Sequence, residues 1–145
     1  MAFTSLSAVA ATTTTLNLKG SIASLLEIAI AAETLATNLP MDSAVSAQKV
    51  GTVTERSNSG SGYQVSASSQ NSGKLVRTGD NLNFVNYQLS YNNANITLSS
   101  TPTVISTNSL RGVFSRDLKI TYSKPVDFMP AGEYSDTVTL TIAAN

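Results

Sequence analysis

Few side chains in this chain are suited to covalent chemistry. The 145 residues include no histidine and no cysteine. A thiolate nucleophile, a histidine base and a cysteine metal site are therefore excluded. Ser46 and Lys49 match the Ser-x-x-Lys spacing of penicillin-binding enzymes, but such short matches are common in a serine-rich chain and no companion motif follows. We expect the protein not to be an enzyme.

Two groups of oxygen-bearing side chains could in principle hold a cation: Asp80, Asn81 and Asn83, and Asp127, Glu133 and Asp136. Neither group has the spacing of a calcium loop. Turn chemistry accounts for the first, and Asp136 is expected to pair with or cap a loop before the last strand. Residues 60–62 lack the third glycine and the following helix of a phosphate-binding loop, and predict a hairpin tip. We expect no metal and no cofactor.

The charge content argues against electrostatic partners. Charged residues make up 12% of the chain, and nine basic residues balance nine acidic ones. No nucleic acid and no anionic membrane surface is expected as a partner. Serine, threonine and asparagine together supply about a third of the residues, which is typical of an extracellular or assembled surface. The longest apolar stretch, residues 22–32, is too short for a membrane span and contains Glu27. Membrane insertion is not expected.

The first ten residues end in Ala8-Val9-Ala10, which matches an export cleavage site but lacks a basic start and a full apolar segment. Either a signal remnant or a chance match explains this, and the composition favours export. Residues 1–15 hold too little apolar surface to fold alone and predict a tail.

Apolar residues then recur at even positions from Leu16 to Ile30, interrupted at Gly20 and Ser24. This rhythm predicts two strand segments with a bend between them. A three-to-four spacing over Ser21–Leu39 fits an amphipathic helix equally well. Periodicity does not choose between these two interpretations.

Short alternating runs separated by Gly, Asn and Ser turns fill the rest of the chain. The predicted strands lie at about 50–55, 63–67, 74–77, 87–91, 96–98, 113–122 and 134–142. In the last of these, Tyr134, Val138, Leu140 and Ile142 share one face. Seven or eight short strands in about 130 residues predict an all-β antiparallel sandwich. We expect one domain, residues 23–145, preceded by an extension, residues 1–22.

The segment 130–142 resembles the closing strand of the spore coat protein U family, which includes the major pilins of the archaic chaperone-usher pathway. The likeness lies in Gly132, Tyr134, Asp136, Thr137 and Val138, which match Gly-x-Tyr-x-Asp-Thr-Leu/Val. Residues 57–71 resemble the strand-turn-strand of that family, and residues 16–22 its N-terminal strand. Many relatives carry a cysteine pair that this chain lacks.

This resemblance implies a secreted filament subunit: an immunoglobulin-like sandwich of about seven strands that lacks one strand. A periplasmic chaperone and an outer-membrane usher would handle it, and the N-terminal strand of an identical subunit would complete it at the cell surface. The donor residues would be Leu16, Leu18 and Ile22, with Gly20 at a shallow part of the groove. The acceptor groove would be lined by Ile28, Ile30, Tyr134, Val138, Leu140 and Ile142.

Two alternatives remain open. Residues 16–22 could be an ordinary first strand of their own domain, folded in cis. The protein could also be a closed extracellular sandwich that binds carbohydrate or a host surface, or a coat protein that forms no filament.

Overall fold

Regular structure in the computed structural model, which describes residues 1–5 and 8–145, consists of eleven strands and one short helical turn. The strands are β1 (Leu26–Ala32), β2 (Val45–Ser57), β3 (Tyr63–Ser69), β4 (Lys74–Arg77), β5 (Asp80–Asn86), β6 (Gln88–Tyr91), β7 (Ala94–Ile96), β8 (Thr103–Asn108), β9 (Gly112–Tyr122), β10 (Tyr134–Ser135) and β11 (Val138–Ala144). The helical turn is η1 (Thr34–Thr37). None of the described helical segments is long and apolar enough to cross a membrane.

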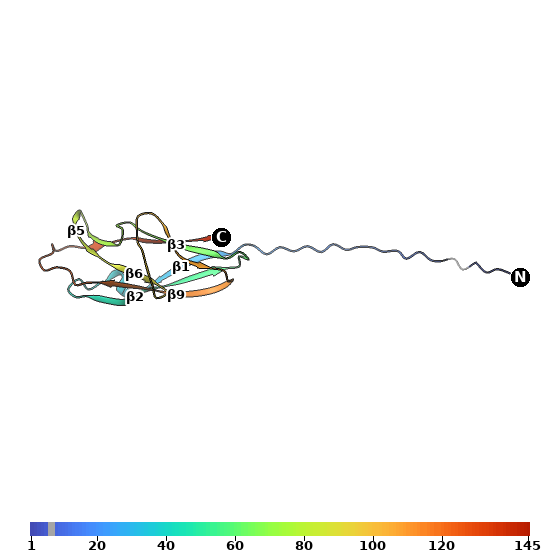
Figure 1. Ribbon diagram of the computed structural model, residues 1–145, viewed down its shortest axis with the longest axis horizontal. Coiled ribbons are helices and arrows are strands. Elements are labelled where there is room, and N and C mark those ends of the chain that lie inside the picture. The colour runs from blue at the N-terminus through green and yellow to red at the C-terminus, as the bar shows by residue number, and fades with distance from the viewer. Residues whose placement is uncertain (6–7) are drawn as a thin grey trace.

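The strands form three antiparallel sheets. A five-stranded sheet has the order β1-β2-β9-β6-β7, a three-stranded sheet has the order β11-β3-β8, and a smaller one has the order β10-β4-β5. In Figure 1, β3 and the C-terminus lie on one side of the domain, and β2 and β9 lie on the other. The fold is all-β and sandwich-like, as the strand pattern predicted.

The core lies between the five-stranded sheet and the sheet of β3. Buried residues of neighbouring strands fill it: Val53, Leu89, Leu118, Ile120 and Tyr122 from the first, and Tyr63, Val65 and Ala67 from the second. The two-residue rhythm predicted for residues 63–67 and 118–122 is confirmed, since the inward positions are buried. β2 and β9 pair over most of their length, with Val53 opposite Arg116.

The number of strands was underestimated. β8 was missed because its pairing with β3 shifts register between Val65 and Ser66, and because Val104 on this strand is exposed. A bulge of this kind interrupts the alternation from which a strand is recognised. β5 begins within the segment that was predicted as a turn, residues 78–81.

Residues 21–39, for which a helix and a strand were both considered, mostly form a strand, β1, followed by the short 3₁₀ turn η1. β1 pairs with β2 along its whole length, from Leu26 opposite Ser57 to Ala32 opposite Gly51. This ladder supplies β1 with backbone hydrogen bonds that a helix would have made within itself. Gly51 permits the close approach, because a Cβ there would lie 3.2 Å from the Ala31 carbonyl oxygen. The helix interpretation of residues 21–39 is therefore wrong, and within that range only η1 is helical.

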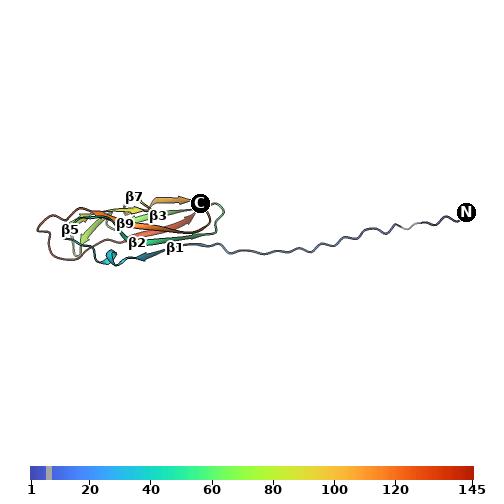
Figure 2. The ribbon, with the colours of Figure 1, turned by 90° about the horizontal axis from the view of Figure 1, so that it is seen from below.

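Residues 8–25 carry no regular secondary structure. They leave the domain as an extended segment, with the N-terminus far from the sheets (Figures 1 and 2). The first of the two predicted strand segments, around Leu16–Ile22, is thus not a strand within this single chain.

The last predicted strand is interrupted. Tyr134 in β10 pairs with Arg77 of β4, whereas Val138 in β11 pairs with Ser69 of β3. Between them, the Asp136 carboxylate accepts a hydrogen bond from the backbone N–H of Thr137 at 2.7 Å. This local bond competes with ladder pairing and separates the two strands.

Candidate strand-acceptor groove

Two sheet edges lie next to each other without pairing. β1 is the end strand of the five-stranded sheet, and β11 is the end strand of the sheet of β3. Some Cα atoms of the two strands approach within 8 Å, but no ladder joins them. Each strand thus presents one row of backbone N–H and C=O groups that lacks a ladder partner among the described residues. Edges of this kind are templates for a further strand.

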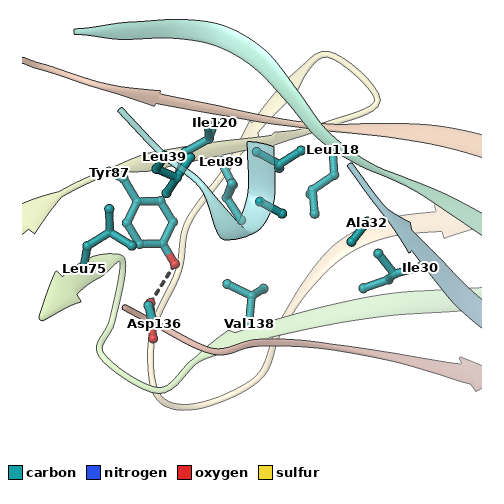
Figure 3. A pocket seen from close by; sticks show the side chains of 12 residues that line it. Ile30, Ala32, Leu39, Leu75, Tyr87, Leu89, Leu118, Ile120, Asp136 and Val138 are labelled. Atoms are coloured by element: carbon teal, nitrogen blue, oxygen red, sulfur yellow. Dashed lines mark hydrogen bonds between the residues drawn. The ribbon is translucent and has the colours of Figure 1, made fainter. Parts of the chain in front are cut away.

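An apolar cavity of about 180 Å³ opens between these two edges. Figure 3 shows Ile30 and Ala32 of β1 on one side and Val138 of β11 near the other. Deeper in the cavity, core residues of the five-stranded sheet and of β4 form the floor: Val50, Leu75, Leu89, Leu118 and Ile120. Ile30 retains 47% of its surface although it belongs to a core-facing row. The hydrophobic core is therefore accessible along this seam.

One end of the cavity is polar. The Asp136 carboxylate accepts hydrogen bonds from the Tyr87 hydroxyl at 2.6 Å, the Ser69 hydroxyl at 2.5 Å and the Asn71 N–H at 2.9 Å. Burial, followed by the neighbouring Asp136 carboxylate, raises the pKa of Tyr87 above its ordinary value. The hydroxyl thus stays protonated and donates to the carboxylate. Asp136 caps a loop, as predicted, and its oxygens are already occupied.

The six predicted acceptor residues do not all share one environment. Ile30 and Val138 line the cavity. Ile28, Leu140 and Ile142 pack against the core while remaining partly exposed. Tyr134 stands apart, because it lies in β10 and lines a neighbouring hollow of about 490 Å³ beside η1. Its hydroxyl donates to the Pro130 carbonyl oxygen at 2.8 Å.

The four predicted donor residues lie in the extended tail. Leu16, Leu18 and Ile22 are 82%, 86% and 93% exposed. A Cβ added to Gly20 would meet no atom within 4 Å. The structure thus does not bring the donor residues to the groove of their own chain.

Asn58 holds the base of this tail, and it was assigned only to a turn in the sequence. Its side-chain oxygen accepts from the Leu25 N–H at 2.8 Å, and its side-chain nitrogen donates to the Ala23 carbonyl oxygen at 2.8 Å. Its own N–H donates to the Leu25 carbonyl oxygen at 3.1 Å. No local sequence signal distinguishes these contacts from ordinary turn chemistry, because the partners lie more than thirty positions away.

A buried carboxylate was also missed. Glu55 on β2 is fully buried and accepts hydrogen bonds from the hydroxyls of Tyr63, at 2.6 Å, and Tyr91. The Nε atom of Arg116 lies 3.5 Å from the same carboxylate. Burial, and then this carboxylate, raise the pKa of Tyr63 to about 12. Its partners come from three other strands, β3, β6 and β9, so the cluster has no local motif.

Lys49, Asp80 and Asn83, which were also considered for chemistry, have structural contacts. The Lys49 ammonium pairs with Asp117 at 2.8 Å. Asp80 accepts from the Leu82 N–H at 2.9 Å and from the Asn83 amide, as expected of a turn. Across residues 1–5 and 8–145, no group of three or more acidic, histidine or cysteine side chains is placed to hold a metal ion.

No protein-family model matches the chain, and a search of curated proteins found no match.

Proposed function

We propose that this protein is the structural subunit of a secreted bacterial filament, which polymerises when its N-terminal segment adds a strand to the groove of a neighbouring identical subunit. One observation carries the proposal. β1 and β11, whose outer edges have no ladder partner among residues 1–5 and 8–145, flank an apolar cavity, while a segment of the same chain with alternating apolar residues lies exposed.

The two parts are chemically complementary. Strand addition uses main-chain hydrogen bonds for affinity and alternate side-chain pockets for register. The groove offers both, because its edges are unpaired and its floor is formed by core residues such as Leu118. The tail offers Leu16, Leu18 and Ile22 on one face of an extended segment.

In an unpolymerised subunit, the open groove and the exposed apolar tail both favour aggregation. Exposed edges beside an open core invite unspecific pairing, and each buried leucine or isoleucine contributes about 1.5–3 kcal/mol when removed from water. An unpolymerised subunit would therefore need protection. A periplasmic chaperone that fills the groove, and an outer-membrane usher that replaces it with the next tail, fit this requirement. The filament would then lie outside the cell.

The proposal is tested with the purified chain by size-exclusion chromatography and negative-stain electron microscopy. We expect a ladder of oligomers and thin filaments. A chain with serine at positions 16, 18 and 22 should remain monomeric, whereas the matched outward substitution Lys19→Ala should still polymerise. A monomeric wild-type chain whose melting temperature does not rise when a peptide of residues 12–24 is added contradicts the proposal. A closed binding module would behave in this way.

A further inference from the structure

The N-terminal tail could insert into the groove of its own chain instead of the groove of a neighbour. Only three residues, 23–25, separate Ile22 from the first residue of β1, and loops of three residues are common in hairpins. A hairpin closed by that loop would place Ile22 opposite Leu26 and Leu18 opposite Ile30. Both inward rows fall on even positions, so the hairpin would match apolar face to apolar face. Such a self-completed chain could not donate.

The contacts of Asn58 oppose this hairpin. Its side chain holds the Leu25 N–H and the Ala23 carbonyl oxygen, each at 2.8 Å, with residues 23–25 extended away from the groove. A turn through residues 23–25 would have to break both bonds. The base of the tail also lies against the 57–62 turn, where Ala23, Ser24, Asn58 and Arg111 line one hollow.

We propose that Asn58 is a positioning residue, an amide clamp that keeps the tail extended and suppresses its folding back into its own groove. The clamp prolongs the β1–β2 ladder by one residue pair, since the N–H of Asn58 also donates to the Leu25 carbonyl oxygen. Beyond that pair, the side chain replaces the backbone of a strand. Pairing within the chain therefore ends at Ala23, and the donor segment begins at Ile22. This inference rests on the proposed function, because self-completion matters only if the groove accepts a strand.

The clamp can be measured directly in the monomer, at concentrations below those at which oligomers form. The chain has no cysteine, so Lys19→Cys and Thr139→Cys introduce two unique sites for nitroxide labels on outward positions. With the tail extended, the labels should lie about 40 Å apart, from a rise of about 3.3 Å per residue over some six residues on each side of the exit. Folded back, they should lie below about 25 Å. Dilution with unlabelled chain restricts the measurement to distances within one molecule.

We expect mostly the long distance, with a minor short population, in the otherwise unchanged chain. Asn58→Ala removes two exposed hydrogen bonds and should raise the ratio of short to long distances about fivefold. Asn58→Asp keeps the acceptor for Leu25 but loses the donor to Ala23, and should fall between the two. Asn95→Ala, at an exposed asparagine on β7, is the matched control and should change nothing. Equal distance distributions in the Asn58→Ala and Asn95→Ala chains overturn the clamp.

A second measurement needs no variant at position 58. In the wild-type chain, hydrogen exchange should be slower at the Leu25 amide than at the Ser24 amide, because only the former is hydrogen-bonded to Asn58. Equal exchange at the two amides also overturns the clamp. Failure of the proposed function is a separate result: a peptide of residues 12–24 would then bind no groove, whatever the label distances and the exchange rates are.

Discussion

Truncation of Leu18 separates donation by the tail from any role of the tail within its own domain. Leu18 is 86% exposed in the single chain, so Leu18→Ala should leave the free energy of unfolding unchanged, within about 0.5 kcal/mol. In the groove of a neighbour, the same side chain would be buried against core residues. The expected cost thus falls entirely on binding.

The magnitude follows from the atoms removed. Leucine to alanine deletes about three methylene equivalents, each contributing about 0.8 kcal/mol when fully buried, or about 2.4 kcal/mol in total. This corresponds to an affinity about 60-fold weaker. The flanking acceptor residues Leu140 and Ile142 are themselves only partly buried. If only half of the donor side chain is removed from water, the loss of binding free energy is about 1.2 kcal/mol and the affinity falls about eightfold.

The assay uses an acceptor chain that cannot donate, with serine at positions 16, 18 and 22. Labelled peptides of residues 12–24 are titrated against it, and their dissociation constants are read from fluorescence anisotropy. The matched control is the Lys19→Ala peptide, whose change lies on the outward face of the same segment. Its affinity should stay within about twofold of the unchanged peptide.

Equal affinities of the Leu18→Ala and Lys19→Ala peptides would refute the reasoning, because register in strand addition depends on the inward face. Loss of stability in the full-length Leu18→Ala chain, measured at concentrations at which the chain is monomeric, would also refute it, since that result would place Leu18 inside its own domain.

Three further predictions address the donor segment, the acceptor strand β11 and the core. Gly20→Val should leave the melting of the free chain unchanged, because a Cβ at Gly20 meets nothing within 4 Å, but it should weaken peptide binding measurably; unchanged anisotropy curves would place Gly20 outside the groove. Val138→Thr should weaken binding about tenfold by leaving a hydroxyl unpaired under the donor, whereas Thr139→Ser on the outward face serves as its control and should not. The pKa of Tyr63 rises from 10.0 to about 12, so urea titrations should give a free energy of unfolding that is constant up to pH 10 and falls between pH 10 and 12; a constant value through pH 12 would contradict this.

Alternation predicted the central strands and the edge strand β11, but not the edge strand β8. Leu118, Ile120 and Tyr122 lie in a central strand with one buried face, so their spacing alone identifies β9. β8 is an edge strand with a bulge, and its apolar residues do not alternate cleanly. A bulge places two residues of one strand opposite a single residue of its partner, so the two-residue period is lost where the bulge occurs.

The candidate groove was only partly predictable for a related reason. Val138, Leu140 and Ile142 were found because they follow one another in one strand. The floor residues, such as Leu75 and Leu89, come from strands that are brought together only by the fold. The contacts of the Glu55 carboxylate were even less predictable, since its partners come from three strands, β3, β6 and β9. Contacts of this length leave no local period in a sequence.

The direction of the donor decides whether the chains form a filament or a closed pair. The tail leaves the domain beside Asn58, at the end where β11 finishes, since Asn145 donates to the Gly62 carbonyl oxygen in the adjacent turn. A donor antiparallel to β11 would emerge near Val138, at the opposite end of the acceptor. Its own domain would then follow in the same orientation, and repetition gives an open chain.

A donor parallel to β11 would instead emerge near Ala144, beside the acceptor's own tail. Two such chains could then exchange tails about a two-fold axis and stop at a dimer. Analytical ultracentrifugation distinguishes these outcomes: we expect a concentration-dependent series of oligomers, because a parallel donor would have to double back at the point where the acceptor's tail leaves. A single dimer that persists on concentration would establish the parallel direction and exclude filament growth by this joint.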